Sequence, residues 1–161
     1  MSNKCWILIA LLSFSFGCGK KATEDGPRTA VIIPGVLADQ FLLHVNEHRI
    51  KLGLNPLESA EVIEEQAFEH SRAMAAKKRS FGHYGKGLRC QKIRDAFGSG
   101  RQCGEIIAMG PNGPQEVFDL WIRTTAHRQL LEAAHYTHTG LGFEKDADGV
   151  MYWTLIFYAI P

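Results

Sequence analysis

The chain has 161 residues, a formal net charge of +1, 45% hydrophobic and 22% charged residues, and four cysteines. These values are typical of one globular domain, and the length leaves no room for a second full domain. A near-neutral chain has no electrostatic footprint for nucleic acid or for an acidic membrane surface, because such binding needs clustered Lys and Arg. We therefore expect no nucleic-acid partner.

The N-terminal residues predict export. Lys4 precedes an apolar run over residues 5–16, and small residues then lead to Cys18, which is the pattern of a secretory signal peptide over residues 1–17. The apolar run is shorter than the roughly 20 residues that a membrane-spanning helix needs. Cleavage is therefore the interpretation we favour over an uncleaved anchor.

Cys18 is the predicted site of lipidation. Gly17 and Cys18 resemble the end of a bacterial lipobox, in which the cysteine is acylated after cleavage, although Ser15 stands where leucine is usual. Two or more acyl chains give stable membrane attachment. The sequence thus predicts a membrane-anchored cell-envelope lipoprotein, with plain secretion as the alternative.

Residues 18–36 hold this cysteine and a segment without hydrophobic periodicity, which we interpret as a flexible tether. The folded domain is expected over residues 37–161. Cys90 and Cys103 are the cysteines left in that domain, and an even pair in an exported protein favours a disulfide. A metal site or a redox pair is the alternative, but the spacing is not C-x-x-C.

Hydrophobic periodicity predicts helices over residues 37–52 and 59–78, separated by a break that contains Gly53 and Pro56. A short helix is expected near residues 91–97. A fourth helix is expected to begin at Pro114, because the first helical turn tolerates proline.

The last thirty residues predict strands. One starts at Gly140, and another covers residues 150–160 after a hairpin turn at Asp148 and Gly149. The final run is apolar on both alternating faces, so both faces must be covered. This pattern predicts an α+β fold, a single-domain α-β-α sandwich with a central antiparallel sheet.

Several histidines and basic residues have structural interpretations. His44 and His48 fit the zinc-peptidase pattern H-x-x-E-H, but we interpret them as the border of a core-facing helix. We expect His70 to be a hydrogen-bonded core histidine. The basic run 77–79 is expected to be a solvated face, and the ring of Trp121 is expected to be core.

His83, Glu105 and His127 form the remaining candidate site. Each lies near a Gly-rich turn or a predicted helix end. Two neutral imidazoles and a carboxylate suit Zn²⁺ with a water in an open position, provided that the fold brings the three side chains together.

Seven segments in chain order resemble the CAP superfamily, which is named for cysteine-rich secretory proteins, antigen 5 and pathogenesis-related 1 proteins and is also called the SCP domain. These segments are 45–49 with 53–57, 70–74, 81–83, 103–108, Trp121 with 126–128, 140–143, and 152–154. The resemblance covers about residues 37–161. It implies an α-β-α sandwich and a cleft with a His, Glu, Glu, His tetrad that often holds a divalent metal.

Three members of that tetrad map onto His83, Glu105 and His127. The second glutamate position is occupied by Thr124, as in many short bacterial members that the chain resembles. A hydroxyl can form hydrogen bonds but cannot supply the charge or the general base of a carboxylate. Asn46 and Arg49 resemble the family's structural pair on the first helix.

The function that this resemblance implies is a non-enzymatic binding module. Its binding cleft is expected to contain His83, Glu105, Thr124 and His127 and to take a metal, a lipid or sterol, or a protein partner. Zn²⁺ or another divalent cation would be held by His83 and His127. The alternative is a zinc-dependent hydrolase or peptidase with Glu105 as the candidate catalytic base, and a purely structural role comes third.

Overall fold

The computed structural model describes residues 34–100 and 102–160. The predicted signal peptide, the predicted acylation site Cys18 and nearly all of the tether lie outside the described residues. The helices and strands, in chain order, are α1 (Pro34–Lys51), β1 (Glu58–Ser59), α2 (Glu61–Ala75), α3 (Lys86–Phe97), β2 (Cys103–Met109), α4 (Pro114–Arg123), α5 (Thr125–Leu131), β3 (His138–Lys145) and β4 (Met151–Tyr158).

The sheet has the strand order β1-β3-β4-β2. β4 lies at the centre and pairs antiparallel with β3, where Leu141 faces Leu155, and with β2, where Ile106 faces Leu155. β1 adds a two-residue parallel pairing to the start of β3. The predicted central antiparallel sheet is therefore confirmed, with one short parallel strand at its edge.

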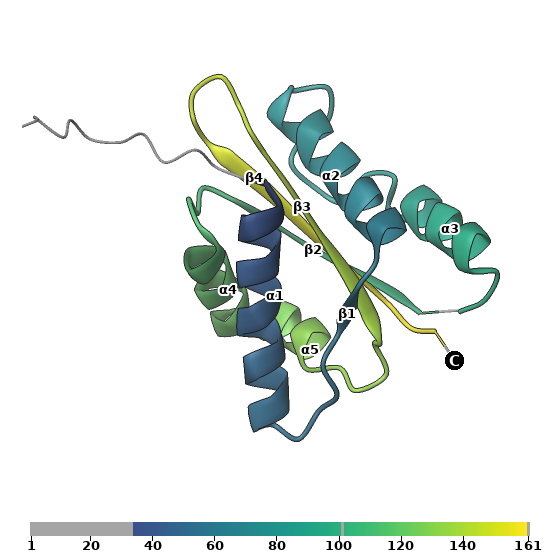
Figure 1. Cartoon of the computed structure of the whole chain (residues 1–161). Helices are drawn as coiled ribbons and strands as arrows, with labels where there is room; N and C mark the ends of the chain where they lie inside the picture. The colour runs from purple at the N-terminus through teal and green to yellow at the C-terminus, as the bar shows by residue number, and fades with distance from the viewer. Residues whose placement is uncertain (1–33, 101, 161) are drawn as a thin grey trace, which may run out of the picture. The chain divides into compact units, whose positions relative to one another are not determined.

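Helices cover both faces of this sheet, as Figure 1 shows, with α1, α4 and α5 on one side and α2 and α3 on the other. Every residue of β4 is buried. Trp153, Leu155 and Phe157 pack with the α1, α4 and α5 layer, whereas Ile156 and Tyr158 pack with α2 and α3. Alternating residues of a strand point to opposite faces, so the two-sided apolar pattern requires both layers, and the α-β-α sandwich is confirmed.

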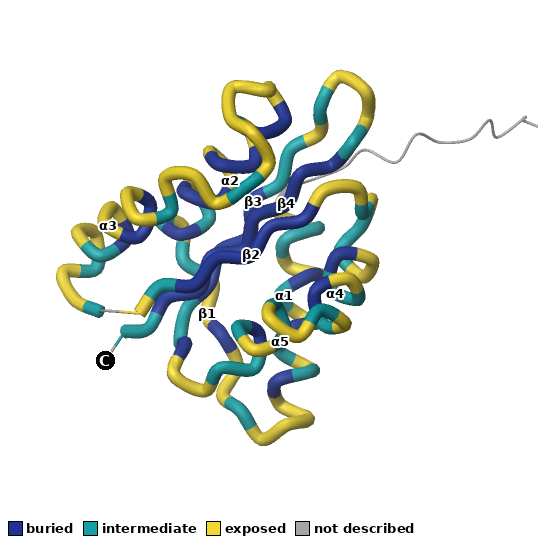
Figure 2. The backbone as a smooth tube through the Cα atoms, turned by 180° about the vertical axis from the view of Figure 1, so that it is seen from behind, coloured by how far each residue is buried: buried dark blue, intermediate teal, exposed yellow. Residues whose placement is uncertain are grey.

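Burial is concentrated in the sheet and on the helix sides that face it, whereas the outer helix surfaces and most connections are exposed (Figure 2). The buried residues form one cluster on the α1, α4 and α5 side and two smaller clusters toward α2 and α3. Trp121 is fully buried, which confirms its expected place in the core, and Trp153 is fully buried as well. The described residues thus form a hydrophobic core on both faces of the sheet.

Two glycines let α2 lie close to the sheet. A Cβ atom at Gly140 would overlap the backbone of Ile63 and Glu64, and one at Gly142 would overlap the backbone of Ala67 and Phe68. The alternation Gly140, Leu141, Gly142 therefore leaves one face of β3 bare, so that the α2 backbone packs directly against it.

Asn46 and Arg49 connect α1 to the segments around its C-terminal end. The Asn46 side chain accepts from the backbone N–H of Leu57 and donates to its carbonyl. Arg49 is fully buried and donates to the carbonyls of Asn55, Leu131, Ala133 and Tyr136. Burial lowers the pKa of Arg49, and these carbonyls satisfy its donors. The structural role that the resemblance implied agrees with these contacts.

Some predicted helix boundaries differ from the structure by a few residues, and some elements were not predicted. α1 begins at Pro34, earlier than residue 37, because proline suits the first turn of a helix. α3 begins at Lys86, earlier than residue 91, and α2 ends at Ala75 rather than at residue 78. β1, β2 and the short α5 were not predicted.

Cys90 and Cys103 form a disulfide, as predicted, with their Cα atoms 5.9 Å apart. It joins α3 to the first residue of β2. None of the helices in the described residues is both long enough and apolar enough to span a bilayer.

Candidate functional site

Glu105 lies on β2, which is the last strand on one side of the sheet. Its neighbours Gly104 and Ile106 face α1, α4 and α5, so the alternation of the strand directs Glu105 toward α2 and α3. Its side chain is 1% exposed. Because β2 is at the edge of the sheet, groups from both helix layers can meet beside it.

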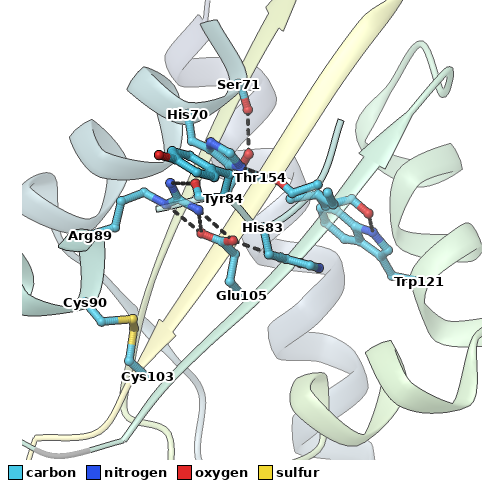
Figure 3. A network of polar contacts seen from close by, with 12 residues as sticks. His70, Ser71, His83, Tyr84, Arg89, Cys90, Cys103, Glu105, Trp121 and Thr154 are labelled. Carbon is cyan, nitrogen blue, oxygen red and sulfur yellow. Dashed lines mark hydrogen bonds and ion pairs between the residues drawn. A yellow bond between two sulfur atoms is a disulfide. The ribbon is translucent and has the colours of Figure 1, made fainter. Parts of the chain in front are cut away.

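Two side chains hold the Glu105 carboxylate, one from each side (Figure 3). Arg89 on α3 donates from Nε to Oε2 at 2.7 Å and from Nη2 to Oε1 at 2.8 Å, which is a bidentate pair. His83 Nδ1 lies 2.8 Å from Oε1. The Arg89 guanidinium neutralises the carboxylate, and both carboxylate oxygens have hydrogen-bond partners.

The segment that carries His83 is fixed at both ends. His70 on α2 places Nε2 2.8 Å from the carbonyl oxygen of Gly82, and Arg89 Nη1 donates to the carbonyl of Tyr84 at 2.9 Å. Gly85 then has φ +78°, a left-handed conformation that suits glycine, and α3 follows. These contacts hold His83 against Glu105 while 49% of its side chain stays exposed.

His70 is buried, as the sequence predicted. Desolvation lowers the pKa of His70, and the Arg89 charge lowers it further, whereas the Glu105 charge and the bond to Gly82 act in the opposite direction. The Gly82 carbonyl can only accept, so Nε2 of His70 donates this bond and positions the His83 segment.

His127 near the start of α5 belongs to the same electrostatic environment. Desolvation lowers the pKa of His127, and the nearby His83 lowers it further. Its Nδ1 atom is buried and has no hydrogen-bond partner among the described residues. A neutral imidazole with an unused buried nitrogen can accept a hydrogen bond or bind a cation. We call His83, Arg89, Glu105 and His127 the His83 site.

Thr124 does not join these contacts. It ends α4 and precedes α5, and its hydroxyl donates to the carbonyl of Leu120 at 3.1 Å. Threonine commonly forms this bond to the residue four positions earlier in a helix. The structure thus brings His83 and Glu105 into contact and His127 into charge range, and gives Thr124 a local helical bond instead.

The side chains near the His83 site can be compared with the ligands that a metal ion requires. Within residues 34–100 and 102–160, no group of three or more His, Cys, Asp or Glu side chains is arranged to hold an ion. Glu105 is already shared by Arg89 and His83. A zinc site with three protein ligands therefore does not fit the described residues.

His44 and His48, which match the H-x-x-E-H pattern, have structural partners. His48 Nε2 lies 2.9 Å from Oε1 of Glu132, and the rings of His44 and His48 lie 6.1 and 5.8 Å from that of Phe118. They line the contact of α1 with α4 and α5, as the sequence interpretation held.

Sequence reasoning missed Arg89. The signal was present, because Arg89 precedes Cys90, and the Cys90–Cys103 disulfide brings α3 to within two residues of Glu105. A cation next to one half-cystine and a carboxylate two residues from the other are expected to lie close together. An apolar hollow of about 620 Å³, lined by residues of α1, α2 and β3, contains none of the predicted site residues.

Comparison with known proteins gives one family. The model of the CAP family, described as the cysteine-rich secretory protein family, matches residues 42–157. The Bacillus subtilis protein YkwD is 32% identical over 117 residues, which are 70% of this chain and 43% of that protein. The B. subtilis membrane protein YlbC is 33% identical over 109 residues, or 66% of this chain and 31% of that protein. The chain therefore spans less than half the length of these relatives.

Solved structures show the same fold. An outer surface protein from Borrelia burgdorferi superposes with a TM-score of 0.67 at 23% identity, over 76% of this chain and 92% of that one. An extracellular protein with an SCP domain from Bacillus anthracis gives a TM-score of 0.64 at 19% identity, over 82% of this chain and 45% of that one. At these identities the likeness establishes the fold alone.

Proposed function

Because the chain belongs to the cysteine-rich secretory protein (CAP) family, we propose that it is an exported, non-enzymatic binding module that recognises its ligand at the His83 site. One observation carries the choice of binding over hydrolysis. Both oxygens of the Glu105 carboxylate are engaged, Oε2 by Arg89 and Oε1 by Arg89 and His83.

A general base must accept a proton from a water within hydrogen-bond reach. The Glu105 side chain is 1% exposed and is paired with a guanidinium, so a water would have to displace Arg89 or His83 to reach it. Thr124 offers no carboxylate in its place. The hydrolase alternative therefore lacks its base, and Glu105 is better suited to hold His83.

His83 is the group that Glu105 orients for a ligand. With the ionised carboxylate as acceptor, Nδ1 of His83 carries the proton and donates, so Nε2 is left as the free acceptor. A carboxylate behind a histidine is also the usual support of a metal-binding imidazole. We propose that His83 and His127 together bind a divalent cation that imidazole favours, such as Zn²⁺, with water in the other positions.

The bound cation would supply a positive charge to which an anionic or carbonyl oxygen of the ligand could bind. With two protein ligands its affinity is expected to be below that of closed zinc sites. A lipid or sterol and a protein surface are the ligand classes that the family resemblance suggests for the cleft. The exposed half of His83 is the contact we propose for them.

Two observations support export. The disulfide is typical of an oxidising compartment, and two structural neighbours are described as an outer surface and an extracellular protein. The lipid anchor at Cys18 stays part of the proposal. Mass spectrometry of the protein from its native membrane tests it, because acylation adds a diacylglycerol to Cys18, and an unmodified Cys18 would mean secretion without an anchor.

Zinc titration by calorimetry tests the His83 site. The wild type is expected to bind one ion, the His83→Ala/His127→Ala variant none, and the Glu105→Gln variant one ion about 10- to 100-fold more weakly, because it loses the support of His83. His44→Ala/His48→Ala is the matched control and should bind like the wild type. Equal heats for the wild type and the His83→Ala/His127→Ala variant would refute the site.

A turnover assay tests the choice of binding over hydrolysis. The wild type and the Glu105→Gln variant are incubated with a peptide and an ester substrate in the presence of Zn²⁺. We expect both to match the rate without protein. Hydrolysis by the wild type that is lost in Glu105→Gln would establish the enzymatic alternative instead.

A further inference from the structure

The charge of the chain is nearly balanced overall but is unevenly distributed. From His70 to Arg94 the sequence has eight Lys and Arg residues and no Asp or Glu. These eight are Arg72, Lys77, Lys78, Arg79, Lys86, Arg89, Lys92 and Arg94. The stretch covers the second half of α2, the connection and most of α3. A net charge of +1 therefore conceals a segment that is strongly basic.

Some of these cations have partners within the fold. Arg89 is paired with Glu105, Arg72 with Glu69, and Lys77 with Asp148. Lys78 and Lys92 are exposed and Lys86 is partly exposed, and none of the three takes part in an ion pair between the described residues. Their positive charge faces solvent without compensation.

Large apolar side chains are exposed among these lysines. Phe81 is 47% exposed, Tyr84 66% and Leu88 65%. Arg79 stacks over the Tyr84 ring, with its guanidinium carbon 4.3 Å from the ring centre. Figure 2 shows the connection after α2 and the outer side of α3 as largely exposed chain.

A hollow of about 430 Å³ between α2 and α3 is lined by Arg79, Tyr84, Leu88 and Lys92, and also by Glu69, which is paired with Arg72. Lys78, Phe81 and Lys86 each lie within two residues of one of these four in the sequence. We call the following residues the basic-aromatic face: Lys78, Arg79, Phe81, Tyr84, Lys86, Leu88 and Lys92. This face combines uncompensated cations with apolar side chains that the fold leaves in water.

We propose that the basic-aromatic face docks the domain on an anionic membrane surface. Lys and Arg near such a surface are attracted by the negative headgroups, and each contributes about fivefold to partitioning. Aromatic and aliphatic side chains insert at the boundary of headgroups and acyl chains, where a tyrosine has both an apolar and a wet partner. The cations and the exposed apolar groups are thus both used.

An anionic polymer such as nucleic acid would also be attracted by the lysines. A base could stack on Phe81 or Tyr84, but the aliphatic side chain of Leu88, which is 65% exposed, would have no apolar partner, so Leu88 favours a lipid surface. The docking depends neither on a metal at the His83 site nor on acylation of Cys18. It would nevertheless bring His83, which lies between Phe81 and Tyr84, next to the membrane.

Vesicle sedimentation tests the docking. The full-length chain with Cys18→Ser, which cannot be acylated, is mixed with phosphatidylcholine vesicles or with vesicles that contain phosphatidylglycerol, in EDTA. All variants share the same N-terminal residues, so the contribution of those residues cancels in the comparison. We expect the wild-type face to prefer anionic vesicles, and we expect this preference to weaken at high salt.

The triple variant Lys78→Gln/Lys86→Gln/Lys92→Gln is expected to lose about 100-fold in partitioning to anionic vesicles, at about fivefold per lysine. The matched control removes three cations elsewhere, Arg123→Gln/Arg128→Gln/Lys145→Gln, and should change partitioning less than about fivefold. Unfolding temperatures close to that of the wild type show that the variants are folded.

A second variant, Tyr84→Ser/Leu88→Ser, separates insertion from charge attraction. We expect it to bind anionic vesicles more weakly than the wild type although its charge is unchanged. The proposal is overturned if the lysine variant binds like the wild type, if the control loses as much as the lysine variant, or if the Tyr84→Ser/Leu88→Ser variant binds undiminished. The last result, together with binding of single-stranded DNA, would identify an anionic polymer as the partner.

Discussion

Replacing Arg89 with methionine is expected to destabilise the fold more than any surface change. The side chains of Arg89 and Glu105 are 11% and 1% exposed, so the substitution leaves a buried carboxylate with His83 as its remaining side-chain partner. Removing one member of a buried ion pair costs about 3–5 kcal/mol, because the other charge stays desolvated and unpaired. For a domain of this size the loss lowers the unfolding temperature by roughly 10–20 °C.

A double-mutant cycle separates the unpaired charge from lost packing. The Arg89→Met/Glu105→Gln variant removes both charges and should recover more than half of the loss, since neutral replacement of a buried pair is often tolerated. Arg94→Met on the same helix is the control, because the Arg94 side chain bonds to Gln91 alone among the described residues, and should change stability by less than about 0.5 kcal/mol. Urea unfolding measures the wild type, Arg89→Met, Glu105→Gln, the double variant and the Arg94→Met control. If Arg89→Met lowers the free energy of unfolding by no more than Arg94→Met does, Arg89 does not stabilise the buried Glu105 carboxylate.

Three further predictions concern the rest of the fold. Gly142→Ala places a methyl group against the backbone of Phe68 and should cost more than about 3 kcal/mol in urea unfolding. Gly113→Ala, with open space around it, should cost no more than about 1 kcal/mol, which is the loss of a favourable N-cap residue of α4. Reducing the Cys90–Cys103 disulfide should lower the free energy of unfolding by roughly 3 kcal/mol, and an equal midpoint with and without reductant would contradict this. The lowered pKa of His127 means that the unfolded chain binds more protons below the ordinary value of 6.5, so stability should fall as the pH drops below that value. His127→Gln should weaken this pH dependence, and an unchanged slope would show that His127 is not the cause.

The layers of the fold were predictable because burial constrains strands strongly. The run from Val150 to Ile160 is apolar on both alternating faces, and such a strand needs cover on both sides. The helices at residues 37–52 and 59–78 followed from their 3.6-residue periodicity. β2 was missed because its segment contains Gly104 and Glu105, which interrupt the apolar pattern of a central strand. Glu105 is buried only because Arg89 and His83 satisfy it, and no local pattern reveals partners that are 16 and 22 residues away.

The sequence alone listed His83, Glu105 and His127 as candidates, but only the family resemblance placed them in one cleft. Sequence spacing alone could not show that His83 and Glu105 touch, because their contact depends on the His70 bond to Gly82 and on the edge position of β2. Because Arg89 pairs with Glu105, we expect Glu105 to hold His83 in place and not to act as a general base. The net charge also hid the basic stretch between His70 and Arg94, because the acidic residues elsewhere in the chain offset it in the sum.

The most direct test of the account is a nitrogen-15 NMR titration of the seven histidine side chains with Zn²⁺. Before zinc, His83 should be in the tautomer with its proton on Nδ1, as its bond to Glu105 requires. On addition of zinc, the ring signals of His83 and His127 should shift together, while those of His44, His48 and His70 stay in place. A His83 proton on Nε2, or zinc shifts at His44 and His48 with none at His83, would contradict the account.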